Sequence, residues 1–303
     1  MNVALIGYGL WGRNLARVLA RRGWLAAVVD VDNDAVCESR RAFPQAQVGT
    51  CLDALAWESV DAVVIATPPQ FHAEQALIAL ECGKDVFSEK PLAMNKEDVR
   101  RLAALADERG LILMTGHILD YHPAVVELLR HCTTGDVGEL RRIETVRTRL
   151  IPRSPHVSVV YELLWHDIAL VSRLIDRPLQ AVSADAMVDP SSEAKFDAET
   201  DGIRVSIGGS LTQPYRQSRV IVTGSEATLV FDDERDWPEK LQRFGREETH
   251  EAVAVAATEP LAAELAHFAE CVRTRTAPRS DAAVAMETLA MAETLESSCL
   301  IPQ

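Results

Sequence analysis

The stretch Val3-Ala4-Leu5-Ile6-Gly7-Tyr8-Gly9-Leu10-Trp11-Gly12 lies at the start of the chain and decides the expected fold. Its first four residues form an apolar run of strand type, and residues 11–22 have helical spacing. The glycines between them form the pattern G-x-G-x-x-G, which at a strand-to-helix turn is typical of a dinucleotide site. Gly7 permits the tight turn, Gly9 lets a pyrophosphate approach bare backbone, and Gly12 lets the helix pack close to the sheet.

A carboxylate stands where a nucleotide ribose would need one. Asp30 ends the next apolar run, 23 positions after Gly7. It can accept hydrogen bonds from the adenosine ribose hydroxyls and would repel a 2′-phosphate, which favours NAD over NADP. We expect Leu10 and Trp11, at the helix start, to contact the dinucleotide as well. Two simpler interpretations stay open: a turn that binds nothing, and an aspartate that only caps a helix, a role that fits Asp32 better.

Apolar runs alternate with amphipathic helices over roughly the first 115 residues. Continuous apolar strands between such helices predict a doubly wound parallel sheet with both faces covered. We therefore predict an α/β Rossmann domain over residues 1–118. Its strands are expected at residues 3–6, 25–30, 62–66, 85–88 and 112–115, and its helices at 11–22, 71–82 and 95–109.

Beyond residue 118 the strand-like runs follow one another, with turn signals such as Gly208-Gly209 between them. This pattern predicts an α+β domain with a mostly antiparallel, open-faced sheet over residues 119–303. Its helices are expected at 123–131, 161–175, 260–273 and 282–298, and its strands at 140–150, 181–188, 202–207, 218–223 and 227–231.

Composition excludes some classes of partner. The chain has 31 basic and 45 acidic residues, a formal charge of −14, so nucleic acid is not an expected partner. It shows no signal peptide and no run of about 18 apolar residues, so no membrane association is expected. Its six cysteines show no C-x-x-C spacing, which predicts reduced thiols, no metal site and a cytoplasmic location.

Two loops that follow predicted parallel strands lie where ligands bind in such sheets. The first is Thr67-Pro68-Pro69-Gln70-Phe71-His72, and the second is Glu89-Lys90-Pro91. For Thr67 the alternative is a helix cap, and for His72 a helix residue without substrate contact. For Lys90 the alternative is a solvated lysine in a turn.

Together with Gly7–Gly12 and Gly83-Lys84, these two loops resemble the Gfo/Idh/MocA family in order and spacing, and the resemblance covers nearly the whole chain. Namesakes of the family include glucose–fructose oxidoreductase and inositol dehydrogenase. The resemblance implies that Lys90 hydrogen-bonds the oxygen that changes oxidation state and stabilises alkoxide character. It also implies a cis peptide bond before Pro91. The loop residues expected to contact the cofactor are Thr67, Pro68, His72, Glu89 and Lys90.

The proton acceptor is expected in the second domain, within Tyr161-Glu162-Leu163-Leu164-Trp165-His166-Asp167. Glu162 and His166 are four residues apart and share a helix face, whereas Asp167 is rotated away. The resemblance implies that His166 accepts the proton, since it matches the histidine of the family's Asp-x-x-x-His-Asp pattern. Glu162 departs from that pattern by one methylene group, which leaves the hydrogen-bond geometry open. The alternative for His166 is a packed helix residue.

Further residues resemble members of the family that oxidise a UDP-sugar at its 3-hydroxyl. His117 and Tyr121, in Gly116-His117…Tyr121-His122-Pro123, are candidate substrate ligands. Arg216 or Arg219, in Pro214-Tyr215-Arg216-Gln217-Ser218-Arg219, is either a bidentate fork for a diphosphate or a strand residue exposed to water. Arg149 and Arg153 are weaker candidates of the same kind.

The leading hypothesis is an NAD-dependent dehydrogenase that acts on a secondary alcohol of a sugar or nucleotide-sugar. The alternatives are a reductase of a keto-sugar or other carbonyl compound, and a non-catalytic NAD-binding sensor. The resemblance further implies a homodimer or homotetramer formed through the sheet of the second domain.

Overall fold

The computed structural model describes residues 1–150, 158–175, 179–186, 192–246 and 249–299. Packing divides the chain into two compact units, residues 1–117 with 261–289 and residues 118–260 with 290–303. The division into domains 1–118 and 119–303 stays a prediction. The compact units differ from it in one respect, because residues 261–289 group with the first unit.

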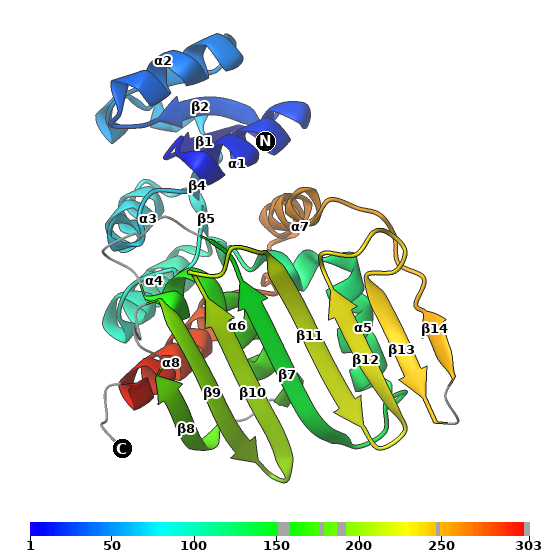
Figure 1. Ribbon diagram of the computed structural model, residues 1–303. Coiled ribbons are helices and arrows are strands. Elements are labelled where there is room, and N and C mark those ends of the chain that lie inside the picture. The colour runs from blue at the N-terminus through cyan, green and yellow to red at the C-terminus, as the bar shows by residue number, and fades with distance from the viewer. Residues whose placement is uncertain (151–157, 176–178, 187–191, 247–248, 300–303) are drawn as a thin grey trace. The chain divides into compact units, whose positions relative to one another are not determined.

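The first unit contains a six-stranded parallel sheet with the order β3-β2-β1-β4-β5-β6 (Figure 1). All residues of β1 and β4 are buried, so both faces of the sheet centre are covered. This confirms the predicted doubly wound Rossmann fold. Its strands are β1 Val3–Ile6, β2 Leu25–Val29, β3 Gln47–Gly49, β4 Ala62–Ile65, β5 Asp85–Ser88 and β6 Leu113–Thr115, and the helices between them are α1 Leu10–Arg21, α2 Asn33–Ala42, α3 His72–Glu81 and α4 Lys96–Arg109.

Two elements of the first unit were not predicted, strand β3 and helix α2. Strand β3 is three residues long at the sheet edge, and Val48 is its one large apolar residue. Helix α2 buries only Ala35, Val36 and Ser39. An element that buries so little carries a weak periodic signal, which is why the sequence pattern passed over both.

Residues 261–289 pack on the β5–β6 side of the sheet. Phe268 of α7 (Pro260–Thr274) lies edge-on to Phe87, with ring centroids 5.8 Å apart. Ser280 forms two hydrogen bonds with Thr115 at the end of β6. It accepts from the Thr115 backbone N–H at 2.8 Å and donates through its hydroxyl to the Thr115 carbonyl at 2.6 Å. This segment therefore covers an edge strand that would otherwise expose unpaired backbone groups.

The second unit contains an eight-stranded sheet with the order β14-β13-β12-β11-β7-β10-β9-β8. Every neighbouring pair is antiparallel except β7 and β10, which confirms the mostly antiparallel sheet. The strands are β7 Leu140–Thr148, β8 Gln180–Ala186, β9 Glu193–Thr200, β10 Ile203–Ser210, β11 Gln217–Gly224, β12 Ala227–Asp232, β13 Leu241–Gly245 and β14 His250–Ala252, and the helices are α5 Pro123–Thr133, α6 Trp165–Ile175 and the end of α8 Ala282–Cys299.

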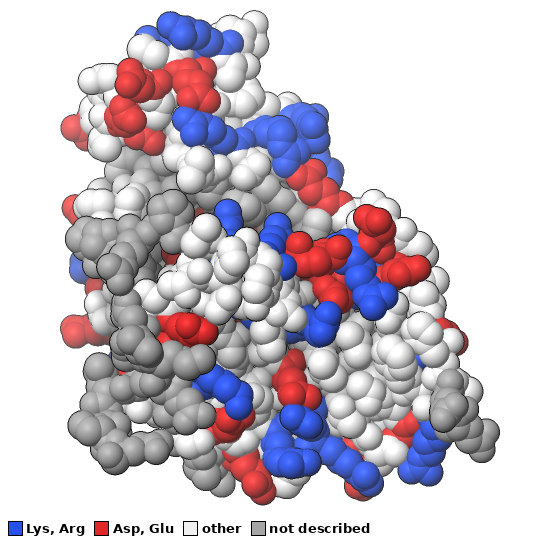
Figure 2. Space-filling model, in the orientation of Figure 1, with Lys and Arg blue, Asp and Glu red and all other residues white. Residues whose placement is uncertain are grey.

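One face of this sheet packs on helices α5 and α6, and the opposite face is open (Figure 1). Val220 and Leu229 on the helix side are fully buried. On the open side, Val146 and Phe244 are each 39% exposed. Figure 2 shows acidic and basic side chains interspersed on this open face. The open-faced sheet that the sequence predicts is therefore present.

The prediction of a turn at Gly208-Gly209 is wrong, because both glycines lie inside strand β10. The reason is a close approach of another element to the strand. A Cβ atom at Gly209 would lie 2.5 Å from Cδ2 of Leu164 and 3.0 Å from the carbonyl oxygen of Arg147. Leu164 ends the π-helical turn Val160–Leu164 that precedes α6. Gly209 thus serves packing and not a change of chain direction.

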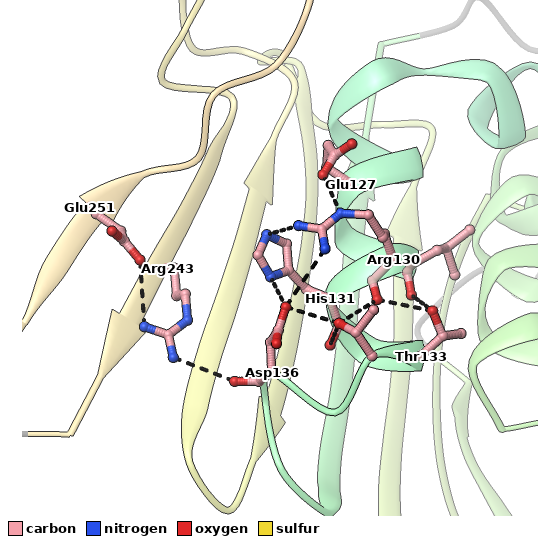
Figure 3. A network of polar contacts seen from close by, with 9 residues as sticks. Glu127, Arg130, His131, Thr133, Asp136, Arg243 and Glu251 are labelled. Atoms are coloured by element: carbon pink, nitrogen blue, oxygen red, sulfur yellow. Dashed lines mark hydrogen bonds and ion pairs between the residues drawn. The ribbon is translucent and has the colours of Figure 1, made fainter.

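A surface network ties the end of α5 to the edge of the sheet (Figure 3). His131 lies 2.8 Å from the carboxylate of Asp136 and 3.0 Å from the guanidinium of Arg130, and Arg243 donates to the Asp136 carbonyl at 3.4 Å. Basic residues in the last turn of a helix also interact favourably with its dipole. We interpret this network as structural.

We predict that Gly209→Ala lowers stability whereas Gly208→Ala does not. The new methyl group at residue 209 meets Leu164 and forces repacking at a cost of about 1–3 kcal/mol. At residue 208 the nearest atoms lie 3.8 Å away, an ordinary contact. Urea unfolding followed by circular dichroism measures both variants, and equal midpoints would contradict the packing role of Gly209.

Candidate active site

The turn between β1 and α1 has the shape that a pyrophosphate requires. A Cβ atom at Gly7, where φ is +95°, would lie 2.6 Å from the carbonyl oxygen of Ala66. At Gly12 it would lie 2.1 Å from the carbonyl oxygen of Gly7, whereas at Gly9 it would meet nothing within 4 Å. Two glycines are thus required by packing, and the third leaves open space at the start of a helix that has no side-chain cap. Backbone N–H groups in such a place bind phosphate.

Asp30 lies beside this turn at the end of β2. Its Oδ2 accepts the backbone N–H of Tyr8 at 2.6 Å, and its Oδ1 accepts that of Asp32 at 2.9 Å. Each oxygen retains a lone pair for a ribose hydroxyl. The alternative capping role belongs to Asp32, whose side chain accepts from the Asp34 N–H at 2.9 Å and caps α2.

Large exposed apolar side chains of the first unit, in the part of the chain that the structure describes, follow the carboxyl ends of the parallel strands. At this edge such side chains are available to contact a ligand. Sequence reasoning missed three of these side chains because single apolar residues in loops carry no periodic signal. The full set is Leu10, 87% exposed, Trp11, 38%, Val31, 88%, Phe71, 46%, and Met94, 42%. Leu10 and Trp11 were expected to contact the dinucleotide, and Val31, Phe71 and Met94 are the three that were missed.

His72 braces the loops that follow β4 and β5. Its Nε2 lies 2.7 Å from the Thr67 carbonyl oxygen, and its Nδ1 lies 2.7 Å from the Pro91 carbonyl oxygen. The side chain is buried, and burial lowers the pKa of His72. We infer that His72 acts on the loops, and a direct contact with the cofactor stays a prediction.

In the loop after β4, Thr67 does not have the helix-capping role that was the alternative prediction. The Thr67 hydroxyl donates to the side chain of Gln75 in α3 at 2.6 Å, so it does not cap that helix. Pro68 is exposed and follows the carboxyl end of β4, at the same edge of the sheet as the glycine turn. The structure thus leaves Pro68 accessible to a ligand at this edge.

Lys90 follows β5 and is partly buried, and the peptide bond between Lys90 and Pro91 is cis, as the resemblance implied. Glu89, the residue before it, accepts a hydrogen bond from the indole Nε1 of Trp11 at 2.5 Å. Burial raises the pKa of Glu89 to about 7, while the Trp11 hydrogen bond and the charge of Lys90 act to lower it. The cation of Lys90 therefore has an ionisable carboxyl group beside it.

His117 and Tyr121, both candidate substrate ligands, lie near the end of β6 in sequence. His117 is 1% exposed, and Tyr121, in the 3-10 turn Ile118–Tyr121, is 3% exposed. Neither side chain is without an interaction partner in the structure. Their contact with a substrate stays a prediction.

Glu162 and His166 form the accessible stripe of the second unit's site helix. From Val159 to Val171 all residues are buried except Glu162 and His166, which are partly exposed. The helix begins with the π turn Val160–Leu164 and continues as α6, where a plain α-helix was predicted. A π turn is common at functional sites. Both side chains are partly exposed, which agrees with the shared face that the sequence predicts, and that shared face stays a prediction.

Asp167 points away from that stripe and holds the helix on the sheet. It is fully buried and forms a bidentate ion pair with Arg147 of β7, with N–O distances of 2.7 and 3.0 Å. Sequence reasoning missed this pair because the two residues lie 20 positions apart on different elements. The pair fixes the rotation of the helix that carries Glu162 and His166.

Arg216 matches neither predicted alternative fully, because its guanidinium group is partly exposed and already has carboxylate partners. It forms ion pairs with Asp233 at 3.1 Å and Glu234 at 2.8 Å, although its side chain is 62% exposed. A hydrogen bond from His122 lowers the pKa of Asp233, and Lys240 adds to this effect. A diphosphate at Arg216 would thus replace existing carboxylate partners. Arg153 lies outside the described residues.

The described residues contain neither a metal site nor a membrane-spanning helix. No group of three His, Cys, Asp or Glu side chains there is arranged to hold a metal ion. No described helix has both the length and the apolar character needed to cross a membrane. The cysteines Cys37, Cys51, Cys82, Cys132 and Cys271 are unpaired.

Comparison with known proteins identifies the family. Residues 1–117 match the Gfo/Idh/MocA model, described as an oxidoreductase family with an NAD-binding Rossmann fold. UDP-N-acetylglucosamine 3-dehydrogenase from Acidithiobacillus ferrooxidans is 30% identical over 243 residues, which is 76% of this chain and 74% of that protein. The chain belongs to the Gfo/Idh/MocA oxidoreductase family.

Solved structures and a further relative agree with this membership. The structure of the same A. ferrooxidans enzyme matches with a TM-score of 0.88 and 27% identity, over 98% of this chain and 97% of that one. The NAD-dependent scyllo-inositol 2-dehydrogenase from Bacillus subtilis is 25% identical over 72% of this chain and 69% of its own length. GenD2 from gentamicin A biosynthesis, solved with NAD, shares the fold, with a TM-score of 0.84 and 23% identity over 99% of this chain and 94% of that one. The chain is an oxidoreductase with an NAD-binding Rossmann fold.

We predict that Gly9→Ala weakens NADH binding by about tenfold or more and leaves stability unchanged. The added methyl group meets no protein atom, so it obstructs only a ligand that needs the bare backbone. NADH fluorescence titration measures affinity and thermal unfolding measures stability. Unchanged affinity would contradict the assignment of the turn as the phosphate site.

We also predict that Arg147→Met lowers the free energy of unfolding by about 3 kcal/mol or more, because it leaves a buried carboxylate unpaired. Arg142→Met, on the same strand, breaks an exposed pair with Glu144 and should cost less than about 1 kcal/mol. The double variant Arg147→Met/Asp167→Leu should recover at least half of the loss. Urea unfolding tests all three, and equal losses in both single variants would contradict the role of the buried pair.

Proposed function

We propose that this protein oxidises a secondary hydroxyl group, the 3-hydroxyl, of a sugar carried on a nucleoside diphosphate. One observation carries the proposal. Lys90 follows the carboxyl end of β5, and the glycine turn follows the carboxyl end of the parallel strand β1, so both lie at the same edge of the sheet. Lys90 also belongs to the loop that His72 holds through its hydrogen bond with Pro91. The similarity to UDP-N-acetylglucosamine 3-dehydrogenase, which spans most of both chains, supports the substrate class.

The residues of the first unit fit NAD. Gly9 and the start of α1 would hold the pyrophosphate, Asp30 the adenosine ribose, and Val31 would contact the adenine side. When bound, NAD supplies the acceptor for the hydride that leaves the substrate carbon. The carboxylate of Asp30 at the ribose position favours NAD over NADP, because it would repel a 2′-phosphate.

Lys90 stabilises the reacting oxygen in this proposal. Its ammonium group hydrogen-bonds the hydroxyl of the substrate, and the interaction strengthens as that oxygen gains negative charge. Partial burial of Lys90 increases the strength of this electrostatic interaction, because less water competes for the charge.

His166 accepts the proton that the hydroxyl group loses as the carbonyl forms. A neutral imidazole suits this role near neutral pH. Glu162 lies on the same stripe and orients the substrate or the imidazole through its carboxylate. The π turn displaces Glu162 relative to an ordinary α-helix, and we propose that the longer side chain is matched to this altered position. The reverse reaction, reduction of a keto-sugar, would use the same residues, with His166 as the proton donor.

We propose further that the chain works in the cytoplasm as a homodimer or homotetramer. The open face of the second unit's sheet supports such an interface, since Val146 and Phe244 lie exposed among neighbouring ion pairs there. The unpaired cysteines are compatible with a reducing compartment.

We predict that the protein forms NADH with UDP-sugars and not with the corresponding free sugars. Lys90→Ala should lower kcat by about 10²- to 10³-fold and change NADH affinity little, because it removes a group that acts mainly in the transition state. Lys84→Ala, at the opposite end of β5, is the matched control and should keep full activity. NADH absorbance follows the reaction.

Three outcomes would contradict this proposal. Equal turnover of the free sugar would exclude the nucleotide-linked substrate class. Turnover by Lys90→Ala at the parental rate would exclude the assigned role of the lysine. NAD binding without turnover of any sugar would favour a sensor over an enzyme.

A further inference from the structure

Trp11 connects the phosphate-binding turn to the loop that carries Lys90. Its indole Nε1 donates to Oε1 of Glu89 at 2.5 Å, across 78 positions of sequence. The other carboxylate oxygen, Oε2, accepts from the backbone N–H of Lys90 at 3.4 Å. The carboxyl group of Glu89 therefore lies between the dinucleotide turn and the lysine.

The surroundings of Glu89 are tightly packed on the side of β6. A Cβ atom at Gly116 would lie 3.0 Å from Oε2 of Glu89 and 3.1 Å from Oε1. The backbone of Gly116 thus bounds the carboxyl group on this side, while Glu89 as a whole is partly exposed. Glycine at this position follows from the space that Glu89 needs.

The charged and titratable groups around Glu89 are few. Lys90 is adjacent, and its positive charge favours the carboxylate form of Glu89. His72 packs on the same loop, and its lowered pKa favours the neutral ring. His117 follows Gly116 and is buried. The ionisation of Glu89 therefore depends mainly on burial, on Lys90 and on the donor from Trp11.

We propose, on the basis of the proposed function, that Trp11 and Glu89 form a positioning pair that keeps Glu89 ionised and so holds Lys90 as an oriented ammonium group. The indole supplies the strongest hydrogen bond that the carboxylate receives from another element, and the carboxylate in turn favours the charged form of the lysine. Trp11 is a positioning residue in this scheme, because it acts on Lys90 through Glu89.

The pair also links cofactor binding to the charge at Lys90. Trp11 lies between Gly9 and Gly12, so a dinucleotide on that turn restricts the indole. Coupling between two binding events is reciprocal. If the bound dinucleotide favours the Trp11–Glu89 hydrogen bond, then ionised Glu89 must favour the dinucleotide by the same factor. The affinity for NADH should accordingly fall as Glu89 takes up a proton.

The first test measures the pair without turnover. The protein has five tryptophans, and loss of one indole N–H resonance in Trp11→Phe assigns the Trp11 signal in the nitrogen-15-labelled protein. We expect this signal to shift across the neutral pH range in the parent and to lose that shift in Glu89→Gln. NADH affinity should fall about three- to tenfold below the same midpoint. A pH-independent Trp11 signal, or a shift that survives in Glu89→Gln, would overturn the proposal.

The second test uses the pH profile of kcat. Removal of the indole donor raises the pKa of Glu89, so Trp11→Phe should move the acid limb of the profile upward by about one pH unit. Its activity should be about fivefold low at pH 7, approach about tenfold low at more acidic pH, and recover at higher pH. Glu89→Gln should stay slow at every pH, and Trp24→Phe, in the same unit but remote from Glu89, should match the parent.

An equal loss of activity by Trp11→Phe at every pH would mean that Trp11 only packs, and the proposal would be wrong. Failure of the proposed function has a different signature. In that case the parent protein would not oxidise UDP-sugars, while the Trp11 resonance and the NADH titration would still show whether the pair exists.

Discussion

Helix α1 passes so close to the end of β1 that a side chain at Gly12 would overlap the carbonyl oxygen of Gly7. This approach places the helix start, with its N–H groups, over the edge where the parallel strands end. It also brings Trp11 within hydrogen-bonding distance of Glu89, on the loop after β5. The phosphate turn and the lysine loop are therefore parts of one packed arrangement, and a change in the first should affect the second.

The second unit orients its site helix by a different means, a buried ion pair and a close backbone contact. Asp167 and Arg147 fix the rotation of the helix, and Gly209 lets the π turn approach β10. A buried ion pair contributes little net stability compared with an apolar pair, so its value here is orientation. The result is a helix with one accessible stripe, formed by Glu162 and His166.

Local patterns in the sequence predicted the elements but not the contacts between distant ones. Strands β1 and β5 have the predicted bounds, since their apolar runs end at a turn or at a charged residue. Gly208-Gly209 misled the prediction because glycine serves close packing as well as turns. The return of residues 261–289 and the partners of Arg216 had no local signal, because the residues that contact them lie far away in the sequence or on another loop. The roles of the site residues stay predictions.

A chain with a net charge of −14 repels anions at long range, yet NAD and a nucleotide-sugar are both anionic. At the glycine turn, backbone N–H groups can bind a phosphate without a positively charged side chain. Arg216 offers a cation already compensated by Asp233 and Glu234, so a diphosphate could bind there only by exchanging places with carboxylates. Such an exchange selects for ligands with correctly placed phosphates over anions in general, because a poorly placed anion gains less than the displaced carboxylates lose. If Arg216 is the diphosphate ligand that the sequence predicts, selectivity for the nucleotide-linked sugar depends on replacing internal ion pairs and not on an excess of positive charge.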